Sequence, residues 1–148
     1  MIQIQIPNLR LLSLPSATQG EDWIKTSQLL DNELEALNFD LESESVYLLF
    51  SHSPTETLEG VGSCLVARPV IGPSKDVSLP LKLHDYPTQT VWKTELKGTS
   101  LVEVLEEAEE AWTKARFKGK ILKEEFILRI SRRLSPKLEL SLEAIFLE

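Results

Sequence analysis

Apolar and polar residues alternate at the start of the chain, and the same order of predicted elements then occurs twice. Apolar side chains at every second position of residues 2–6 predict a half-buried strand, because successive strand side chains point to opposite faces. A helix over residues 21–38, a buried strand over 46–50 and a further strand over 60–70 follow. Residues 1–72 therefore predict one unit of strand, helix, strand and strand.

Residues 77–148 repeat this order after a short linker at residues 71–76, which contains a glycine-proline pair. Apolar or alternating segments predict the strands of this second unit at residues 77–83, 91–96, 121–131 and 138–147. A linker of this length does not separate two domains. The sequence therefore predicts one domain, residues 1–148, built from two similar halves.

The helix of the second unit carries the clearest local signal. Ser100 and Glu103 have the spacing of a capping box, in which the serine hydroxyl accepts a hydrogen bond from the backbone N–H three residues later. Apolar residues then recur every three or four positions up to a predicted end at Gly119, and glutamates occupy the opposite face. Each helix must bury an apolar stripe. We therefore expect an α+β fold with antiparallel sheets, two helices and a central groove between the halves.

Composition narrows the possible partners. The chain has 23 acidic and 16 basic residues and a formal net charge of −7, which disfavours binding to nucleic-acid phosphates. We therefore expect no nucleic-acid partner. No apolar run approaches the roughly 20 residues of a membrane-spanning helix, and the start of the chain lacks a basic leader. We expect a soluble, cytoplasmic protein that does not bind membranes.

Cysteine and histidine usage argues against a metal or haem site. Cys64 is the single cysteine, so it cannot form an internal disulfide, and its apolar surroundings in the sequence are typical of an inert buried thiol. His52 and His84 have no spacing that would pair them as metal ligands. We expect no metal ion and no cofactor, and haem in particular lacks a convincing ligand histidine.

Several segments of the second half resemble those of one protein family. They are the succession of elements over residues 80–98, the helix of 100–117, the acidic-aromatic strand start Glu124-Glu125-Phe126 and the end of the chain at residues 143–147. Together they resemble the GyrI-like small-molecule-binding domain. The resemblance implies a fold of two strand-helix-strand-strand halves. The family includes the drug-binding domains of some multidrug-sensing transcription regulators, a gyrase-inhibitory protein, and stand-alone members that hydrolyse cyclopropane-bearing toxins.

The resemblance also implies an acidic residue in the groove. Family members usually carry a glutamate followed two residues later by a tyrosine at the start of the penultimate strand, and Glu124 with Phe126 is the nearest match. In a regular strand Glu124 shares a face with Phe126 and Glu125 points to the other face, so only one glutamate enters the groove. We expect Glu124, with Glu125 as the alternative. A carboxylate between aromatic walls attracts a cation or has a raised pKa.

Aromatic residues near the ends of elements are candidates for the groove walls. Trp92 and Trp23 lie near the ends of a predicted strand and a predicted helix, and a place in the core is equally compatible with either. Trp112 falls in the apolar stripe of its helix, which predicts a core position. Tyr47 and Phe50 lie three residues apart on one strand, so they point to opposite faces and only one lines the groove.

Two functions remain open at this point. The first is a stand-alone module that binds a hydrophobic small molecule, cationic or electrophilic, at Glu124, Phe126 and the aromatic walls. The second is a hydrolase of cyclopropane-type electrophilic toxins, in which Glu124 acts as general base. The sequence identifies no protein partner.

Overall fold

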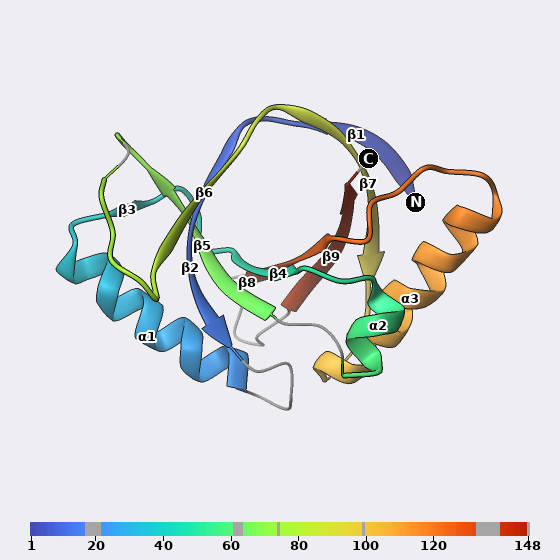
Figure 1. Cartoon of the computed structure of the whole chain (residues 1–148), viewed down its shortest axis with the longest axis horizontal. Helices are drawn as coiled ribbons and strands as arrows, with labels where there is room; N and C mark the ends of the chain where they lie inside the picture. Colours follow the sequence, from blue (N-terminus) through green and yellow to red (C-terminus); the bar gives the residue numbers. More distant parts are fainter. Residues whose placement is uncertain (17–21, 61–63, 74, 99, 133–139, 148) are drawn as a thin grey trace.

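The computed structural model shows a curled antiparallel sheet with helices packed on one of its faces (Figure 1). It describes residues 1–16, 22–60, 64–73, 75–98, 100–132 and 140–147. The strands are β1 (Ile2–Ile6), β2 (Leu9–Ser16), β3 (Asp40–Leu41), β4 (Val46–Phe50), β5 (Cys64–Ile71), β6 (Lys82–Tyr86), β7 (Gln89–Leu96), β8 (Phe126–Arg132) and β9 (Leu140–Leu147). The helices in the described residues are α1 (Asp22–Ala36), α2 (Pro54–Leu58) and α3 (Leu101–Phe117). The predicted α+β fold class with antiparallel pairing is confirmed.

Both long helices form where the apolar periodicity predicts them. At the start of α3 the Ser100 hydroxyl accepts a hydrogen bond from the backbone N–H of Glu103 at 3.3 Å, which confirms the predicted serine cap. Helix α1 ends before Asn38, whose φ of 56° lies in the left-handed region that asparagine tolerates. None of the helices formed by the described residues is long and apolar enough to cross a membrane.

Helix α2 was not predicted; it lies between the strands predicted over residues 46–50 and 60–70. The Ser53 hydroxyl accepts a hydrogen bond from the backbone N–H of Glu56 at 3.2 Å and so caps the first turn. Pro54 follows at the first helical position, where its missing N–H costs no hydrogen bond. A helix of five residues has no repeating apolar stripe, so periodicity could not reveal it.

The strand order places the two parts of the chain side by side. The order is β1-β7-β9-β8-β4-β5-β2-β6, with β3 paired to β5 outside this path. Strands β4 and β8 pair at its centre, and β2, β5 and β4 on one side occupy positions that correspond to β7, β9 and β8 on the other. The division of the chain into two similar halves, 1–72 and 77–148, stays a prediction with which this order agrees.

Two long bent strands curl the sheet. β1 continues into β2 and β6 into β7, and the two pairs run antiparallel in one register, with Ile6 opposite Gln89 before the bend and Leu9 opposite Tyr86 after it. A proline occupies the bend of each strand, where it removes a ladder N–H. In Figure 1 this ribbon arches over β4, β8 and β9. β1 and β6 occupy the two ends of the strand order, and the bent strands link these ends to each other.

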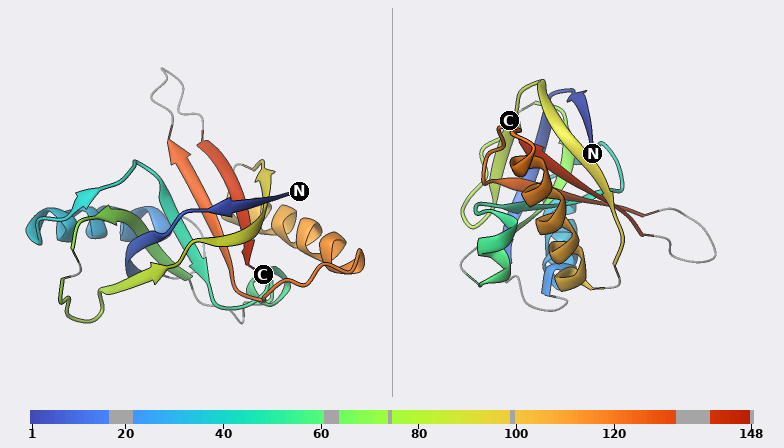
Figure 2. Two further views of the ribbon diagram at one scale, coloured as in Figure 1. Left: turned by 90° about the horizontal axis from the view of Figure 1, so that it is seen from above. Right: turned by 90° about the vertical axis from the view of Figure 1, so that its right-hand side faces the viewer.

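The curl divides the core in two. A helix-side cluster lies between the sheet and the three helices, and an inner cluster lies inside the curl. The inner cluster takes side chains from all eight strands of the path, which is possible only because the sheet wraps around them. Figure 2 shows α1 and α3 at opposite ends of the molecule, each against the helix side of the sheet. Strand parity therefore decides which cluster each side chain joins.

The strand predicted over residues 77–83 is wrong in its first part. β6 begins at Lys82, and Leu79, which continued the alternating pattern, is 85% exposed. Pro80 follows it and cannot donate a hydrogen bond to a neighbouring strand. β6 ends at Tyr86, directly before Pro87.

The strand predicted over residues 121–131 also begins later, at Phe126. The residues before it connect α3 to the sheet. The backbone N–H of Lys123 donates to the Leu147 carbonyl at 2.8 Å, and its carbonyl accepts from Trp112 Nε1 at 3.4 Å. These bonds fix residue 123 against the end of β9 and against α3. An apolar pattern does not distinguish such a tied connection from a strand.

We predict that Ser100→Ala lowers the free energy of unfolding by about 1 kcal/mol, because it removes the cap of α3. For a domain of this size such a loss lowers Tm by roughly 2–4 °C. Thermal and urea unfolding followed by circular dichroism measure both values. The matched control is Ser78→Ala at an exposed position. Equal stability of wild type and Ser100→Ala would contradict the assigned cap.

Candidate ligand-binding face

Four aromatic side chains form a row across four strands on the helix side of the sheet. Trp92 pairs with Phe146, Phe146 with Phe126, and Phe126 with Phe50. These pairings cross β7, β9, β8 and β4 in that order, and all four side chains belong to or pack against the helix-side cluster. We call these four residues the aromatic row. It passes over the β4–β8 pair, where the two parts of the chain meet.

The rings of the row are in contact. The Phe50 and Phe126 rings stack with centroids 4.6 Å apart and an interplanar angle of 6°, and the Phe126 and Phe146 centroids lie 6.2 Å apart. The three phenylalanines are at most 2% exposed, so helices and neighbouring side chains now cover them. Trp92 is half-buried, and the Lys120 ammonium lies 4.5 Å from its ring centroid. The row is therefore closed at its centre and reaches the surface at β7.

The structure brings together most of the aromatic residues proposed from the sequence. Trp92, Phe126 and Phe50 share the row, and the half-buried Trp23 of α1 packs against the same cluster. Tyr47 belongs to the inner cluster. The expectation that Tyr47 and Phe50 point to opposite faces is confirmed. Sequence reasoning missed the row member Phe146, although its alternating strand indicated which face it shares.

Trp112 is buried in the helix-side cluster, as its place in the helical stripe predicts. The Arg116 guanidinium lies 4.7 Å from its ring centroid, so a cation already covers one face of this indole.

The two candidate acidic residues lie outside the strand. Glu124 and Glu125 are both exposed and precede β8, so the alternation of a regular strand does not fix their directions. Burial, and after it the charge of Glu125, raises the pKa of Tyr86, a residue that packs against the inner cluster. Glu125 is therefore near enough to Tyr86 for its charge to act on the phenol. Glu124 as a groove residue, and the central groove itself, stay predictions.

The inner face carries a polar network that sequence reasoning did not identify. Glu143 accepts from Lys93 Nζ at 3.2 Å and from Arg129 Nη1 at 3.3 Å, and Arg129 Nε donates to the Ser45 hydroxyl at 3.2 Å. Burial raises the pKa of the nearby Tyr47 hydroxyl, and the positive charge of Arg129 partly opposes this rise. Both cations of this network share the single carboxylate of Glu143, so one positive charge is not balanced within it. The inner face therefore disfavours a cationic ligand.

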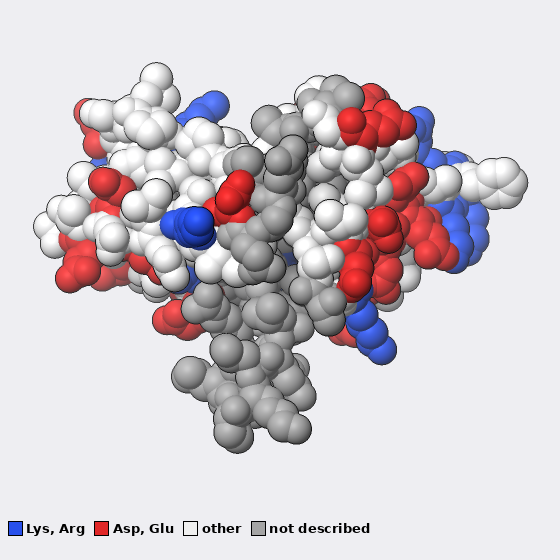
Figure 3. All heavy atoms as spheres, turned by 90° about the horizontal axis from the view of Figure 1, so that it is seen from below, with Lys and Arg blue, Asp and Glu red and all other residues white. Residues whose placement is uncertain are grey.

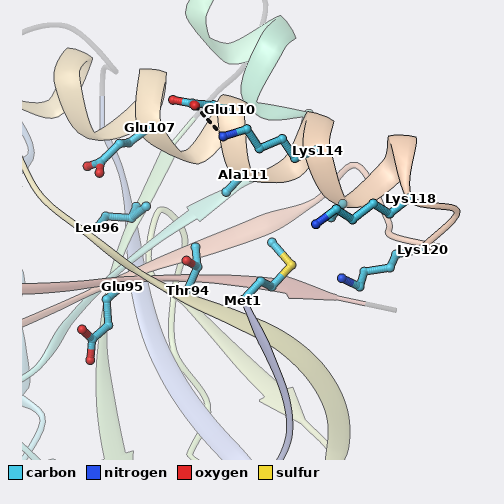
Figure 4. Close-up of a pocket in the computed structure, with 11 residues that line it drawn as sticks. Met1, Thr94, Glu95, Leu96, Glu107, Glu110, Ala111, Lys114, Lys118 and Lys120 are labelled. Carbon is cyan, nitrogen blue, oxygen red and sulfur yellow. Dashed lines mark hydrogen bonds and ion pairs between the residues drawn. The ribbon is translucent and has the colours of Figure 1, made fainter.

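A cleft of about 330 Å³ opens between α3 and β7 (Figure 4). It adjoins the β7 end of the aromatic row, because Lys120, which covers Trp92, also lines it. We call it the α3–β7 cleft. Its lining includes apolar side chains, three glutamates and three lysines. Within the described residues, no three His, Cys, Asp or Glu side chains lie close enough together to hold a metal ion.

Comparisons with known proteins identify the fold. No protein-family model matches the sequence, and no curated protein matches it. The solved C-terminal domain of EcmrR superposes with a TM-score of 0.75 at 14% identity, covering 98% of this chain and 94% of that chain. The chain therefore shares the fold of this domain, in agreement with the GyrI-like resemblance of its sequence. The expectation drawn from the sequence resemblance is thus confirmed for the fold.

Two further structures share this fold. SAV2435, solved with bound tetraphenylphosphonium, gives a TM-score of 0.58 at 12% identity over 98% of this chain and 90% of that chain. EcmrR in an EcmrR–DNA complex gives 0.75 at 15% identity over 98% of this chain, which spans 55% of that chain. Because that structure contains DNA, the expectation that nucleic acid is not a partner gains no support from these likenesses.

Cys64 lies beside the aromatic row, opposite Phe50 on β5. Burial raises the pKa of its thiol to about 12, so the reactive thiolate is scarce near neutral pH. We predict that iodoacetamide at pH 8 leaves Cys64 unmodified in the folded protein and alkylates it in urea, as mass spectrometry measures. The control is Ser78→Cys in a Cys64→Ala background, whose exposed thiol reacts without urea. Alkylation of folded Cys64 at the unfolded rate would contradict the closed row.

Proposed function

We propose that this domain binds a hydrophobic organic cation in a groove between its two halves, over the aromatic row. The observation that supports the proposal is the row itself. Four rings lie next to one another on one face, and helices rather than a second sheet cover them. Ring faces attract cations, and each such contact contributes about 0.5–2 kcal/mol, more where water is excluded. A ligand with aromatic substituents gains ring contacts in addition.

The fold likeness supports the same ligand class. SAV2435 was solved with tetraphenylphosphonium, a cation that carries four phenyl rings. This chain has a row of four aromatic side chains on the helix side of a sheet of the same fold. Tetraphenylphosphonium is therefore the probe with which to test the proposal.

Binding requires the row to open. The three phenylalanines of the row are buried, and Phe50 and Phe126 cover one face of each other, so a ligand reaches ring faces only by displacing the covering side chains and separating these two rings. Displacement costs free energy, so only a fraction of the molecules is open at any time. The apparent affinity is the intrinsic affinity multiplied by that fraction. We propose that opening separates helix from sheet, because side-chain packing holds the helices there, whereas backbone hydrogen bonds hold the strands.

Acidic charge supplies the attraction for a cation. The chain carries a net charge of −7, and Glu124 lies two residues before Phe126 of the row. We assign Glu124 as the carboxylate at the mouth of the groove. Its exposure keeps the carboxylate solvated, so no observation favours the alternative in which it acts as the general base of a hydrolase.

We predict that Phe50→Leu weakens tetraphenylphosphonium binding about twofold to thirtyfold, because it removes one ring from the row. Isothermal titration calorimetry measures the affinity. Tyr47→Leu is the matched control, because it removes a ring from the opposite face of the same strand. Circular dichroism first establishes that both variants fold. Equal losses in the two variants, or no binding to the wild type, would refute the row as the site.

We predict that Glu124→Gln weakens tetraphenylphosphonium binding about twofold to fivefold at low salt, because an exposed charge contributes up to about 1 kcal/mol. The same titration at 0.5 M NaCl should reduce the difference, since salt screens exposed charges. Glu125→Gln is the control, because Glu125 lies toward Tyr86. A larger effect of Glu125→Gln would reverse the assignment of the two glutamates.

A further inference from the structure

The α3–β7 cleft separates its charges into two ends. Glu107 and Glu110 of α3 and Glu95 of β7 contribute acidic groups, and Lys114, Lys118 and Lys120 contribute basic ones. The sequence explains the separation. Residues 103–110 contain five glutamates, whereas residues 111–123 contain five basic side chains and no acidic one. Figure 3 shows the acidic atoms over the α3 lobe and basic atoms at its outer end. The outer end is therefore locally positive on a negatively charged protein.

The acidic groups of the cleft are already engaged or directed elsewhere. Glu107 accepts a hydrogen bond from the backbone N–H of Lys97 at 2.6 Å, which ties α3 to the end of β7. Glu110 pairs with Lys114 at 2.7 Å. Figure 4 shows Glu95 pointing away from the cleft. Within the described part of the chain, only Glu110 of these three is paired with a cation, and the charges that remain on Glu107 and Glu95 lie at the opposite end of the cleft from Lys118 and Lys120.

Two lysines at the other end keep their charge available. Lys118 and Lys120 flank Gly119, whose φ of 83° reverses the chain after α3. Figure 4 shows both amino groups directed to the same side of the cleft. The Trp92 ring holds the Lys120 ammonium at 4.5 Å, and a cation–π contact orients a charge without neutralising it. Among the described residues, neither amino group has a carboxylate within ion-pair distance.

We propose that the α3–β7 cleft binds a small organic anion, with its carboxylate or phosphate group at Lys118 and Lys120. The apolar part of the ligand lies against Leu96 and Ala111, which line the same cleft. The cleft volume of about 330 Å³ suits a compact molecule with one ring or a short chain. The site borders the proposed cation site at Trp92, whose ring contacts Lys120, and does not extend over the three phenylalanines of the row. Its lysines recognise a negatively charged ligand, whereas the ligand proposed for the aromatic row is positively charged.

The test is a titration of the full chain, labelled with ¹⁵N, with benzoate, observed by amide chemical shifts. Benzyl alcohol provides the same ring without charge, and inorganic phosphate provides the charge without a ring. We expect benzoate to shift the amides of Thr94, Leu96, Ala111 and Gly119 in a saturable way, and benzyl alcohol to bind more weakly. Phosphate alone should shift Gly119 and its neighbours but leave Ala111 unchanged. Addition of NaCl should weaken benzoate binding.

The double variant Lys118→Gln, Lys120→Gln should weaken benzoate binding about threefold to twentyfold, since each partly exposed charge contributes up to about 1 kcal/mol. The matched control removes two positive charges elsewhere, in Lys25→Gln, Lys82→Gln, and should leave the affinity within a factor of two. The proposal is overturned by unchanged affinity in the first variant, by equal loss in the control, by equally tight benzyl alcohol binding, or by benzoate shifts confined to other residues. Tetraphenylphosphonium binding is measured separately, so either proposed site can fail alone.

Discussion

The pairing of β4 with β8 is the constraint on which the rest of the structure depends. It joins the two parts of the chain at the centre of the sheet, with Val46 opposite Ile130 and Phe50 opposite Phe126. A slip of one residue would send every side chain of one strand to the other face. Phe126 would then enter the curl and Ile127 would face the helices. The aromatic row, the helix-side cluster and the inner cluster all require this register.

The two faces of the sheet are closed by different forces, and this difference favours the helix side as the place where a ligand binds. The inner face is enclosed by strands whose backbone groups are hydrogen-bonded to one another, and Lys93 and Arg129 share the carboxylate of Glu143 there, which leaves an excess positive charge that disfavours a cation. The helix side is closed mainly by side-chain packing. Each long helix also has a polar tie. Buried Arg68 of β5 donates to both carboxylate oxygens of Asp31 in α1, and Glu107 of α3 accepts from the backbone N–H of Lys97 after β7. Displacing a helix therefore breaks fewer hydrogen bonds than opening the curl.

Local patterns predicted the parts of this structure that depend on near neighbours in sequence. The stripe of α3, its serine cap and the opposite directions of Tyr47 and Phe50 follow from periods of 3.6 and two residues. Strand neighbours could not be predicted in this way. Phe146 joins Phe126 and Trp92 only through two long-range pairings, and parity gives the face of a side chain without naming its neighbours. The candidate site was therefore predicted as scattered aromatic residues rather than as a row.

Connections between helices and strands were also beyond the reach of periodic patterns. Glu124 was assigned to a face by strand alternation, yet β8 begins after it because hydrogen bonds to α3 and β9 hold the backbone of Lys123. The lysines of the α3–β7 cleft converge through the reversal at Gly119, which no periodic pattern describes. The positions of Glu124 and of these lysines both depend on the path of the chain after α3. Both place charged side chains near the edge of the aromatic row.

The central claim is that the aromatic row, on the helix side, receives the ligand. An isotope-filtered nuclear Overhauser experiment on the complex with tetraphenylphosphonium tests it most directly, because it reports which protein protons lie within a few ångströms of the phenyl protons. Our account predicts contacts to the ring protons of Phe50, Phe126 and Trp92. Contacts to Tyr47 and Ile127 of the inner cluster, with none to the row, would contradict it.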